Sequence, residues 1–285
     1  MRIVLTGSKG FIGQHYLEHI KKDNQVWTYD IADGEDLKDK SVVQNMPDCD
    51  VVIHMAATNG TRLFYETPIE VAMNNTLPTM HIIDRYRGQP TKIVFTSTCE
   101  IFNGTTDKGL YNIPTDEQVP IMFDDITNPR WSYSIPKALG ENVISNLEAD
   151  WLILRYFNIY GPHQKDHFIS EFVERLKKGE YYINGNDTRS FCYIDDAVML
   201  THELVKNVSG RIVNVGKQEE LSIDAVAKCI MDVMGIDPTL LEIRDGPKGS
   251  ANRRCPDTSQ LMELTKFRNY TTIQEGIKKT VESLA

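Results

Sequence analysis

Tyr133 and Lys137 stand four residues apart, in a Y-x-x-x-K pattern. On an α-helix, residues at this spacing share one face, so the lysine ammonium can lie beside the tyrosine ring. A free phenol has a pKa of about 10, too high for a base at neutral pH, and a nearby cation lowers it. The pair therefore predicts a tyrosine that takes the proton of an alcohol as a general base.

Polar side chains also lie at the end of the predicted strand 92–97 and directly after it, in the segment T-S-T-C-E at 96–100. Ligands of doubly wound sheets bind at the carboxyl ends of the strands. A hydroxyl in this segment can therefore hydrogen-bond the substrate oxygen that Tyr133 deprotonates. The alternative for any one of these hydroxyls is a cap at the strand end.

The segment T-G-S-K-G-F-I-G at 6–13 follows the first apolar run. Glycines at this spacing permit a tight turn and a close approach of the backbone to a pyrophosphate, which the N–H groups at the start of a helix then hold. This pattern predicts a dinucleotide-binding loop. We expect its phosphate-side residues to be Gly7, Gly10, Phe11, Ile12 and Gly13.

Asp30 ends the second apolar run, where a carboxylate can accept hydrogen bonds from a ribose 2′-hydroxyl. Because a carboxylate repels a 2′-phosphate, the cofactor expected is NAD rather than NADP. The alternative for Asp30 is an ordinary turn residue. Asp36 and Leu37 follow at a distance suited to lining an adenine pocket.

The elements that must position these residues alternate as in β-α-β units. Apolar runs without alternation predict strands buried on both faces, at 2–6, 25–30, 51–55, 92–97 and 151–157, with further strands at 181–184 and 211–215. Amphipathic stretches predict helices at 11–22, 69–87, 134–148, 168–178, 195–206, 222–234 and 272–284. The start at Ser134 is chosen because Pro136 is tolerated only in a first helical turn.

We therefore expect an α/β fold: a Rossmann-type doubly wound parallel sheet with a smaller C-terminal α/β subdomain that binds substrate. The predicted cofactor domain covers 1–160, with 195–216 returning to it. The predicted substrate domain covers 161–194 and 217–285.

Composition excludes several other classes of protein. The chain has 285 residues and a net charge of −9, whereas nucleic-acid binders carry a basic surface. There is no apolar stretch of about 18 residues, so no membrane span is expected. The first apolar run leads straight into the glycine loop, and no signal peptide is expected. Five cysteines without metal-ligand spacing indicate reduced thiols, no metal site and a cytoplasmic protein.

Taken together, the motifs resemble the extended short-chain dehydrogenase/reductase family. Within it they are most similar to the NAD-dependent nucleotide-sugar epimerases, dehydratases and decarboxylases. The resemblance spans residues 1–215 in order and continues more loosely through 253–257. It rests on the glycine loop, D-V-V-I-H-M-A-A at 50–57, Ser97-Thr98, the Tyr133/Lys137 pair and R-Y-F-N-I-Y-G-P at 155–162.

The resemblance implies that NAD takes hydride from sugar C4 while Tyr133 takes the hydroxyl proton, giving a 4-keto intermediate. It implies a homodimer that pairs through 69–87 and 134–148, and a nucleotide-diphosphate sugar as substrate. The implied catalytic residues are Thr98, Glu100, Tyr133 and Lys137. The further cofactor residues it implies, besides Tyr133 and Lys137, are Ala56, Ala57, Asn74 and Tyr156. The implied substrate residues are Thr98, Cys99, Asn158, Arg189 and Arg254.

The reaction after C4 oxidation stays open between epimerisation, decarboxylation and dehydration. Glu100 is typical of the dehydratases and decarboxylases, but Cys99 is a poorer acid for dehydration than the usual Asp. The segment R-W-S-Y-S at 130–134 resembles the glucuronate decarboxylases. Two further alternatives are a 4-keto-sugar reductase that consumes reduced cofactor, and a dinucleotide-binding protein without catalysis.

Overall fold

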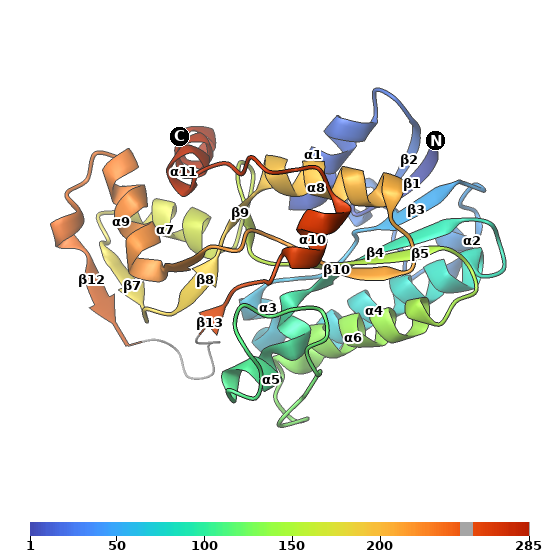
Figure 1. Cartoon of the computed structure of the whole chain (residues 1–285), viewed down its shortest axis with the longest axis horizontal. Helices are drawn as coiled ribbons and strands as arrows, with labels where there is room; N and C mark the ends of the chain where they lie inside the picture. The colour runs from blue at the N-terminus through green and yellow to red at the C-terminus, as the bar shows by residue number, and fades with distance from the viewer. Residues whose placement is uncertain (246–252, 285) are drawn as a thin grey trace. The chain divides into compact units, whose positions relative to one another are not determined.

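A six-stranded sheet with the order β10-β5-β4-β3-β1-β2 organises the first part of the chain (Figure 1). The computed structural model describes residues 1–245 and 253–284. Parallel pairing joins β2 to β1, β1 to β3, β3 to β4 and β4 to β5. The strands are β1 (Arg2–Thr6), β2 (Gln25–Tyr29), β3 (Val51–His54), β4 (Lys92–Thr98), β5 (Trp151–Tyr156) and β10 (Arg211–Val215).

Helices cover both faces of this sheet, which confirms the predicted doubly wound α/β fold. In Figure 1, α4 and α6 lie together on one face and α1 lies on the other. The helices are α1 (Phe11–Ile20), α2 (Lys40–Gln44), α3 (Thr61–Glu66), α4 (Pro68–Tyr86), α6 (Trp131–Ser145) and α8 (Ile194–Asn207), with the short 3-10 helices η1 (Ile31–Asp33) and η2 (Cys99–Phe102).

The core on the α4/α6 side follows from the apolar strands predicted from the sequence. Val52, Ile93 and Ile153 of the central strands are fully buried and belong to one cluster with Ile82 of α4 and Ile144 of α6. Burial of these branched side chains on both faces explains why the strand sequences show no alternation. The predicted strands are confirmed to within one residue at each end.

The chain divides into two compact units. Unit 1 contains residues 1–104, 121–156 and 201–213, and unit 2 contains 105–120, 157–200 and 214–285. Unit 2 holds three small sheets, with the orders β11-β8-β13, β12-β7 and β6-β9. The sequence predicts segment 105–120 as part of the cofactor domain, whereas its contacts place it in unit 2. The predicted substrate segment 217–285 also includes residues 246–252 and 285, which lie outside the described residues.

The elements of unit 2 are short. They are α5 (Asn103–Asp107, which starts in unit 1), β6 (Ile159–Tyr160), α7 (Phe168–Lys177), β7 (Tyr182–Asn184), β8 (Thr188–Ser190), β9 (Cys192–Tyr193), β11 (Glu220–Ser222), α9 (Ile223–Val233), η3 (Pro238–Leu240), β12 (Glu242–Arg244), β13 (Arg253–Arg254), α10 (Ser259–Leu264) and α11 (Ile273–Leu284). The helices and strands predicted in this region are confirmed, with ends moved by no more than one residue.

The predicted start of the helix that carries Tyr133 is wrong. Helix α6 begins at Trp131, so Pro136 lies inside it, in the second turn. Proline has no N–H group, and the carbonyl of Ser132 therefore lacks the α-helical hydrogen bond that position 136 normally supplies. The helix continues because its packing against α4 and β4 holds it. As a result, Tyr133 and Lys137 stand on one continuous helix.

Two buried cations fix the elements of unit 1. Arg155 of β5 and Glu141 of α6 form an ion pair with side chains only 4% and 5% exposed. The guanidinium donates to both carboxylate oxygens, with Nε–Oε1 at 2.9 Å and Nη2–Oε2 at 2.7 Å. Lys92 of β4 donates its ammonium to the carbonyls of Val205 and Val208 at the end of α8.

The described residues hold neither a membrane-spanning helix nor a cluster of metal ligands. Every helix in this part of the chain is too short or too polar to cross a bilayer. No group of three or more His, Cys, Asp or Glu side chains there is arranged to hold a metal ion. All five cysteines are free thiols.

The buried ion pair gives a stability prediction. Arg155→Met leaves the Glu141 carboxylate buried without its partner, and we expect a loss of about 3–5 kcal/mol in the free energy of unfolding, measured by urea denaturation. The double variant Arg155→Met/Glu141→Leu removes both charges and should recover most of that loss. A single-variant loss of about 1 kcal/mol or less, typical of an exposed pair, would contradict this reading.

Candidate active site

The glycine loop joins the end of β1 to the start of α1, as predicted. Gly7 has a φ of +72°, and a Cβ there would lie 2.6 Å from the backbone nitrogen of Ala56. A Cβ on Gly13 would lie 2.0 Å from the carbonyl oxygen of Gly7. No side chain caps α1 at Gly10, and the first N–H groups of a helix have no partners within the helix. The loop therefore presents N–H groups and a helix N-terminus that fit a pyrophosphate.

Asp30 follows β2 and is 8% exposed. One carboxylate oxygen accepts from the backbone of Lys9 in the glycine loop at 2.9 Å, and the other accepts from the backbone of Ala32, also at 2.9 Å. A carboxylate has about four acceptor positions, so two remain for ribose hydroxyls. Asp30 thus ties the phosphate loop to the place where the ribose is expected.

The other predicted cofactor residues border the same sheet edge in unit 1. Leu37 is buried in the core cluster, while the Asp36 side chain is 44% exposed and pairs with Lys38. The other four lie near β3, α4 and β5. The Ala56 backbone donates to the Thr6 hydroxyl, Ala57 is exposed, Asn74 donates to the Thr58 hydroxyl, and the Tyr156 hydroxyl bonds that of Thr201.

The structure brings Thr98 and Tyr133 together. Thr98 is the last residue of β4, and its hydroxyl accepts from the backbone of Glu100 at 3.2 Å. Tyr133 lies in the first turn of α6 and is 6% exposed. Burial, with smaller contributions from Glu100 and Cys99, raises the pKa of Tyr133 above its usual value, while a hydrogen bond with the Thr98 side chain lowers it.

Lys137 lies one helical turn beyond Tyr133, but its ammonium does not reach the phenol oxygen. The Nζ atom donates to the Thr96 carbonyl at 2.7 Å. It lies 4.7 Å from the ring centroid of Phe95 and 5.9 Å from that of Tyr133. Burial lowers the pKa of Lys137 to about 7, although Glu141 acts to raise it. In the protein alone, desolvation of the phenol therefore outweighs any effect of Lys137 on the pKa of Tyr133. That Lys137 lowers this pKa when NAD is bound stays a prediction.

Glu100 lies in η2, directly after β4, and forms an ion pair with Arg130. The distance between Arg130 Nη2 and Glu100 Oε2 is 2.9 Å, and the two side chains are 12% and 15% exposed. Asn103 donates to the same carboxylate oxygen at 2.6 Å. Glu100 is thus a fixed carboxylate near Tyr133 rather than a solvated one. Its neighbour Cys99 is 3% exposed.

The predicted substrate residues of unit 2 gather around β8. Asn158, with a φ of +31°, donates to the carbonyl of Ser190 at 3.0 Å. Arg189 lies on β8 and contacts Asp187 at 3.3 Å. Arg254 lies opposite Arg189 in the parallel pairing of β13 with β8, so two guanidinium groups start from adjacent strand positions. Such a pair suits phosphate oxygens, which arginine binds in a bidentate manner.

Three residues near the site were given no role by the sequence. Arg130 holds Glu100, and its position three residues before Tyr133 was the available indication. Phe64 of α3 stacks on the Tyr133 ring, and nothing in its sequence context pointed to that. His54 is fully buried between the hydroxyls of Thr6 and Thr79, and burial lowers its pKa to about 3, so it is a neutral link between β1 and α4.

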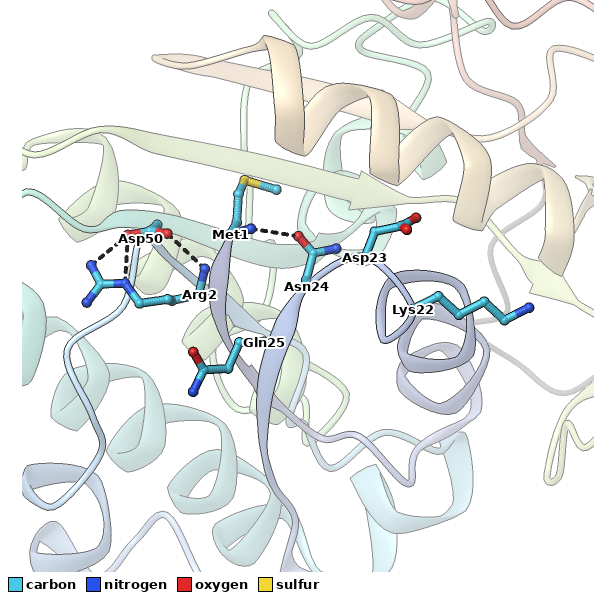
Figure 2. A pocket seen from close by; sticks show the side chains of 7 residues that line it. All are labelled: Met1, Arg2, Lys22, Asp23, Asn24, Gln25 and Asp50. Carbon is cyan, nitrogen blue, oxygen red and sulfur yellow. Dashed lines mark hydrogen bonds and ion pairs between the residues drawn. The ribbon is translucent and has the colours of Figure 1, made fainter.

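A wide hollow of about 520 Å³ lies at the other end of the sheet. Figure 2 shows that it is formed where β1 and β2 begin, and that the Arg2–Asp50 ion pair lies at its edge. These side chains are 53% and 43% exposed. Ligands of doubly wound sheets bind at the carboxyl ends of the strands, so this hollow is not the predicted site.

Comparison with known proteins agrees with the geometry of unit 1. The family model described as "NAD dependent epimerase/dehydratase family" matches residues 3–216. The UDP-N-acetyl-alpha-D-glucosaminuronate decarboxylase of Bacillus cytotoxicus is 29% identical, over 99% of this chain and 97% of its own length. A putative UDP-glucose 4-epimerase of Methanocaldococcus jannaschii is 28% identical, over 98% of this chain and 97% of its own length.

A solved structure has the same fold. The crystal structure of UDP-glucose 4-epimerase with UDP-glucose from Thermotoga maritima superposes with a TM-score of 0.87 and 22% sequence identity. The match covers 100% of this chain and 98% of the other. The fold, with its six-stranded parallel sheet and smaller C-terminal sheets, is therefore one already seen in a solved structure.

Asp30 gives a prediction for the cofactor site. Asp30→Ala removes the acceptor for ribose and frees the Lys9 amide, so we expect NAD to bind at least about 10-fold more weakly in calorimetric titration. Asp33→Asn is the matched control, because Asp33 is 40% exposed and its carboxylate pairs with the Lys9 side chain rather than with the Lys9 amide. Equal NAD affinity in Asp30→Ala and Asp33→Asn would show that Asp30 does not contact the ribose.

Proposed function

The chain belongs to the NAD dependent epimerase/dehydratase family, and from that premise we propose that it oxidises C4 of a nucleotide-activated uronic sugar and then decarboxylates the 4-keto product. The observation that supports C4 oxidation is the buried contact of Tyr133 with Thr98 at the carboxyl end of β4. When bound, NAD supplies a hydride acceptor and a positive charge.

In this proposal the chain's own residues move the proton. Thr98 hydrogen-bonds the sugar oxygen and holds it near Tyr133, whose phenolate oxygen takes the hydroxyl proton. Because burial alone makes the phenol a weak acid, Tyr133 depends on positive charge brought into the site. Lys137 keeps its Nζ on the Thr96 carbonyl, under the ring plane of Tyr133, and from there we propose that it holds cofactor hydroxyls.

The residues after β4 favour decarboxylation as the second step. Once C4 is a ketone, a carboxylate on C5 is lost as CO₂, the electrons of the C5–carboxyl bond pass to the ketone, and C5 then takes a proton from water. We propose that Glu100, held by Arg130 and Asn103, orients that water. Dehydration needs an acid for the departing hydroxyl, and the neighbour of Glu100 is the buried thiol of Cys99.

The comparisons also support this choice. Several relatives are UDP-glucuronic acid decarboxylases, among them one of Xenopus tropicalis that is 25% identical over 98% of this chain. The second candidate reaction is C4 epimerisation, which the putative epimerase of Methanocaldococcus jannaschii favours. Epimerisation leaves C5 untouched, so it gives Glu100 no task.

We further propose that unit 1 binds NAD and that unit 2 binds the diphosphate of the sugar nucleotide through Asn158, Arg189 and Arg254. We propose a cytoplasmic homodimer that pairs through α4 and α6. Supporting the dimer, these two helices carry exposed apolar side chains, with Ile69 69%, Met73 49% and Leu139 41% exposed. Sedimentation measures the assembly directly, and a monomer would rule it out.

The reaction itself can be tested by product mass. Incubation with UDP-glucuronate, UDP-N-acetylglucosaminuronate and UDP-glucose should give a product lighter by one CO₂ from a uronate, with no net formation of reduced cofactor. An unchanged mass with altered stereochemistry would indicate epimerisation, loss of water dehydration, and gain of two hydrogens reduction. Tyr133→Phe should lower turnover by about 10²–10⁴-fold while NAD binding persists, because the proton acceptor is lost.

Glu100→Gln separates decarboxylation from epimerisation. The glutamine retains an acceptor for Asn103 but loses the carboxylate that orients water. We therefore expect product to form about 10²-fold more slowly. Oxidation at C4 should proceed, and the absorbance of reduced cofactor should accumulate. Turnover within about threefold of the unsubstituted protein, with no such absorbance, would mean that Glu100 has no part in protonation at C5 and would remove the support that it gives to decarboxylation over epimerisation.

A further inference from the structure

An aromatic ring from a separate helix covers Tyr133. Phe64 of α3 stacks on the tyrosine with ring centroids 5.3 Å apart and planes inclined by 11°. Phe64 is 3% exposed, and it forms a small apolar cluster with Val71 of α4 and Tyr133, against which Leu63 packs. One face of the phenol ring is therefore closed by a side chain that the chemistry described above does not use.

Local backbone structure fixes where Phe64 lies. The segment before α3 is anchored at Thr58, whose carbonyl accepts from Asn75 of α4 at 2.9 Å. Gly60 then turns the chain with a φ of +145°, a conformation that side chains rarely adopt. The backbone N–H of Phe64 closes the first helical turn on the Gly60 carbonyl at 3.3 Å. Pro68 starts α4 directly after α3, so both ends of the short helix are tied down.

The charged and titratable groups around Tyr133 come from elements other than α3. Glu100 and Cys99 face it from η2, and Lys137 lies below the ring on α6. Helix α3 contributes the pair Arg62–Glu66, whose side chains are 74% and 52% exposed and bond each other. The side chain that α3 places against Tyr133 is therefore the apolar ring of Phe64.

We infer that Phe64 is a positioning residue for Tyr133: its ring fixes the plane of the phenol and keeps water from one face of it, so that the phenol oxygen stays at the carboxyl end of β4. This inference rests on the proposed function, because it assigns Tyr133 as the base. The stacking restrains rotation of the tyrosine about its side-chain bonds. A displacement of about 1 Å at a reacting group costs about 10²-fold in rate.

Removal of the Phe64 ring has two separable effects. Truncation of Phe64 lets water reach the phenol, which reduces the desolvation that raises the pKa of Tyr133. Because the base must be deprotonated, activity is lost as pH falls through that pKa, and a lower pKa moves this acidic limb to lower pH. At the same time the freed ring is held less accurately, so the plateau rate falls.

The test compares Phe64→Ala, Phe64→Tyr and Tyr65→Ala in the full-length protein saturated with NAD. We expect Phe64→Ala to lower plateau kcat by about 10–10²-fold and to shift the acidic limb of the kcat profile down by about one pH unit, with KM changed by less than about threefold. Phe64→Tyr keeps the stacked ring and should stay within about fivefold of the unsubstituted protein. Tyr65, on the same helix but 48% exposed, is the matched control and should leave kcat and the limb unchanged.

A fall in kcat without movement of the acidic limb, or an equal effect of Tyr65→Ala, would overturn the inference, because either is what general loosening of α3 produces. A change in KM alone would overturn it too, since it would make Phe64 a wall of the substrate pocket. Hydrogen–deuterium exchange of the peptide 131–137 gives a readout independent of activity. That peptide should exchange faster in Phe64→Ala and not in Tyr65→Ala, even if no nucleotide sugar is turned over, in which case the proposed function alone fails.

Discussion

Tyr133, in the first turn of α6, and Thr98, at the carboxyl end of β4, interact where water is almost excluded, since the two residues are 6% and 8% exposed. A phenol is a weak acid in such a place, because burial penalises the phenolate. The groups around this phenol determine whether it can lose its proton. Thr98 favours the charged form by hydrogen bonding, and the cofactor brings positive charge to the site only when it is bound. In the proposed mechanism, Tyr133 is therefore active as a base only when NAD is bound beside it.

Other contacts in unit 1 hold α6 in position against β4 and β5. The ion pair of Arg155 with Glu141 holds α6 against β5, and the Lys137 ammonium bonds the β4 backbone two residues before Thr98. A buried ion pair contributes little net stability compared with apolar packing, but it penalises any helix position in which its charges separate. Pro136, one residue before Lys137, has no N–H group to bond within α6. The buried charges therefore hold in place a helix that lacks one hydrogen bond at Pro136.

The fold and the positions of the candidate site residues could be predicted from the sequence, because those features depend on local patterns. The roles of the site residues stay predictions. The glycine loop, the strand-end Asp30 and the Tyr133/Lys137 spacing are each contained within a short segment, and the strands could be predicted to within one residue from their apolar runs. The direction of the Tyr133 pKa and the orientation of the Lys137 amine could not be predicted, because both depend on burial by distant segments. Phe64 contacts Tyr133 only through tertiary packing, so no spacing in the sequence predicts this contact.

In the mechanism that we propose, hydride and proton leave sugar C4 together, Tyr133 accepts the proton, and the hydride returns to the same carbon. A nucleotide uronic sugar carrying deuterium at C4 tests this most directly, with the product examined by mass spectrometry and NMR. The account predicts that the product keeps the deuterium at C4 while C5 gains hydrogen from solvent, and that the label slows turnover. Loss of the deuterium to water, or its appearance on any other carbon, would contradict it.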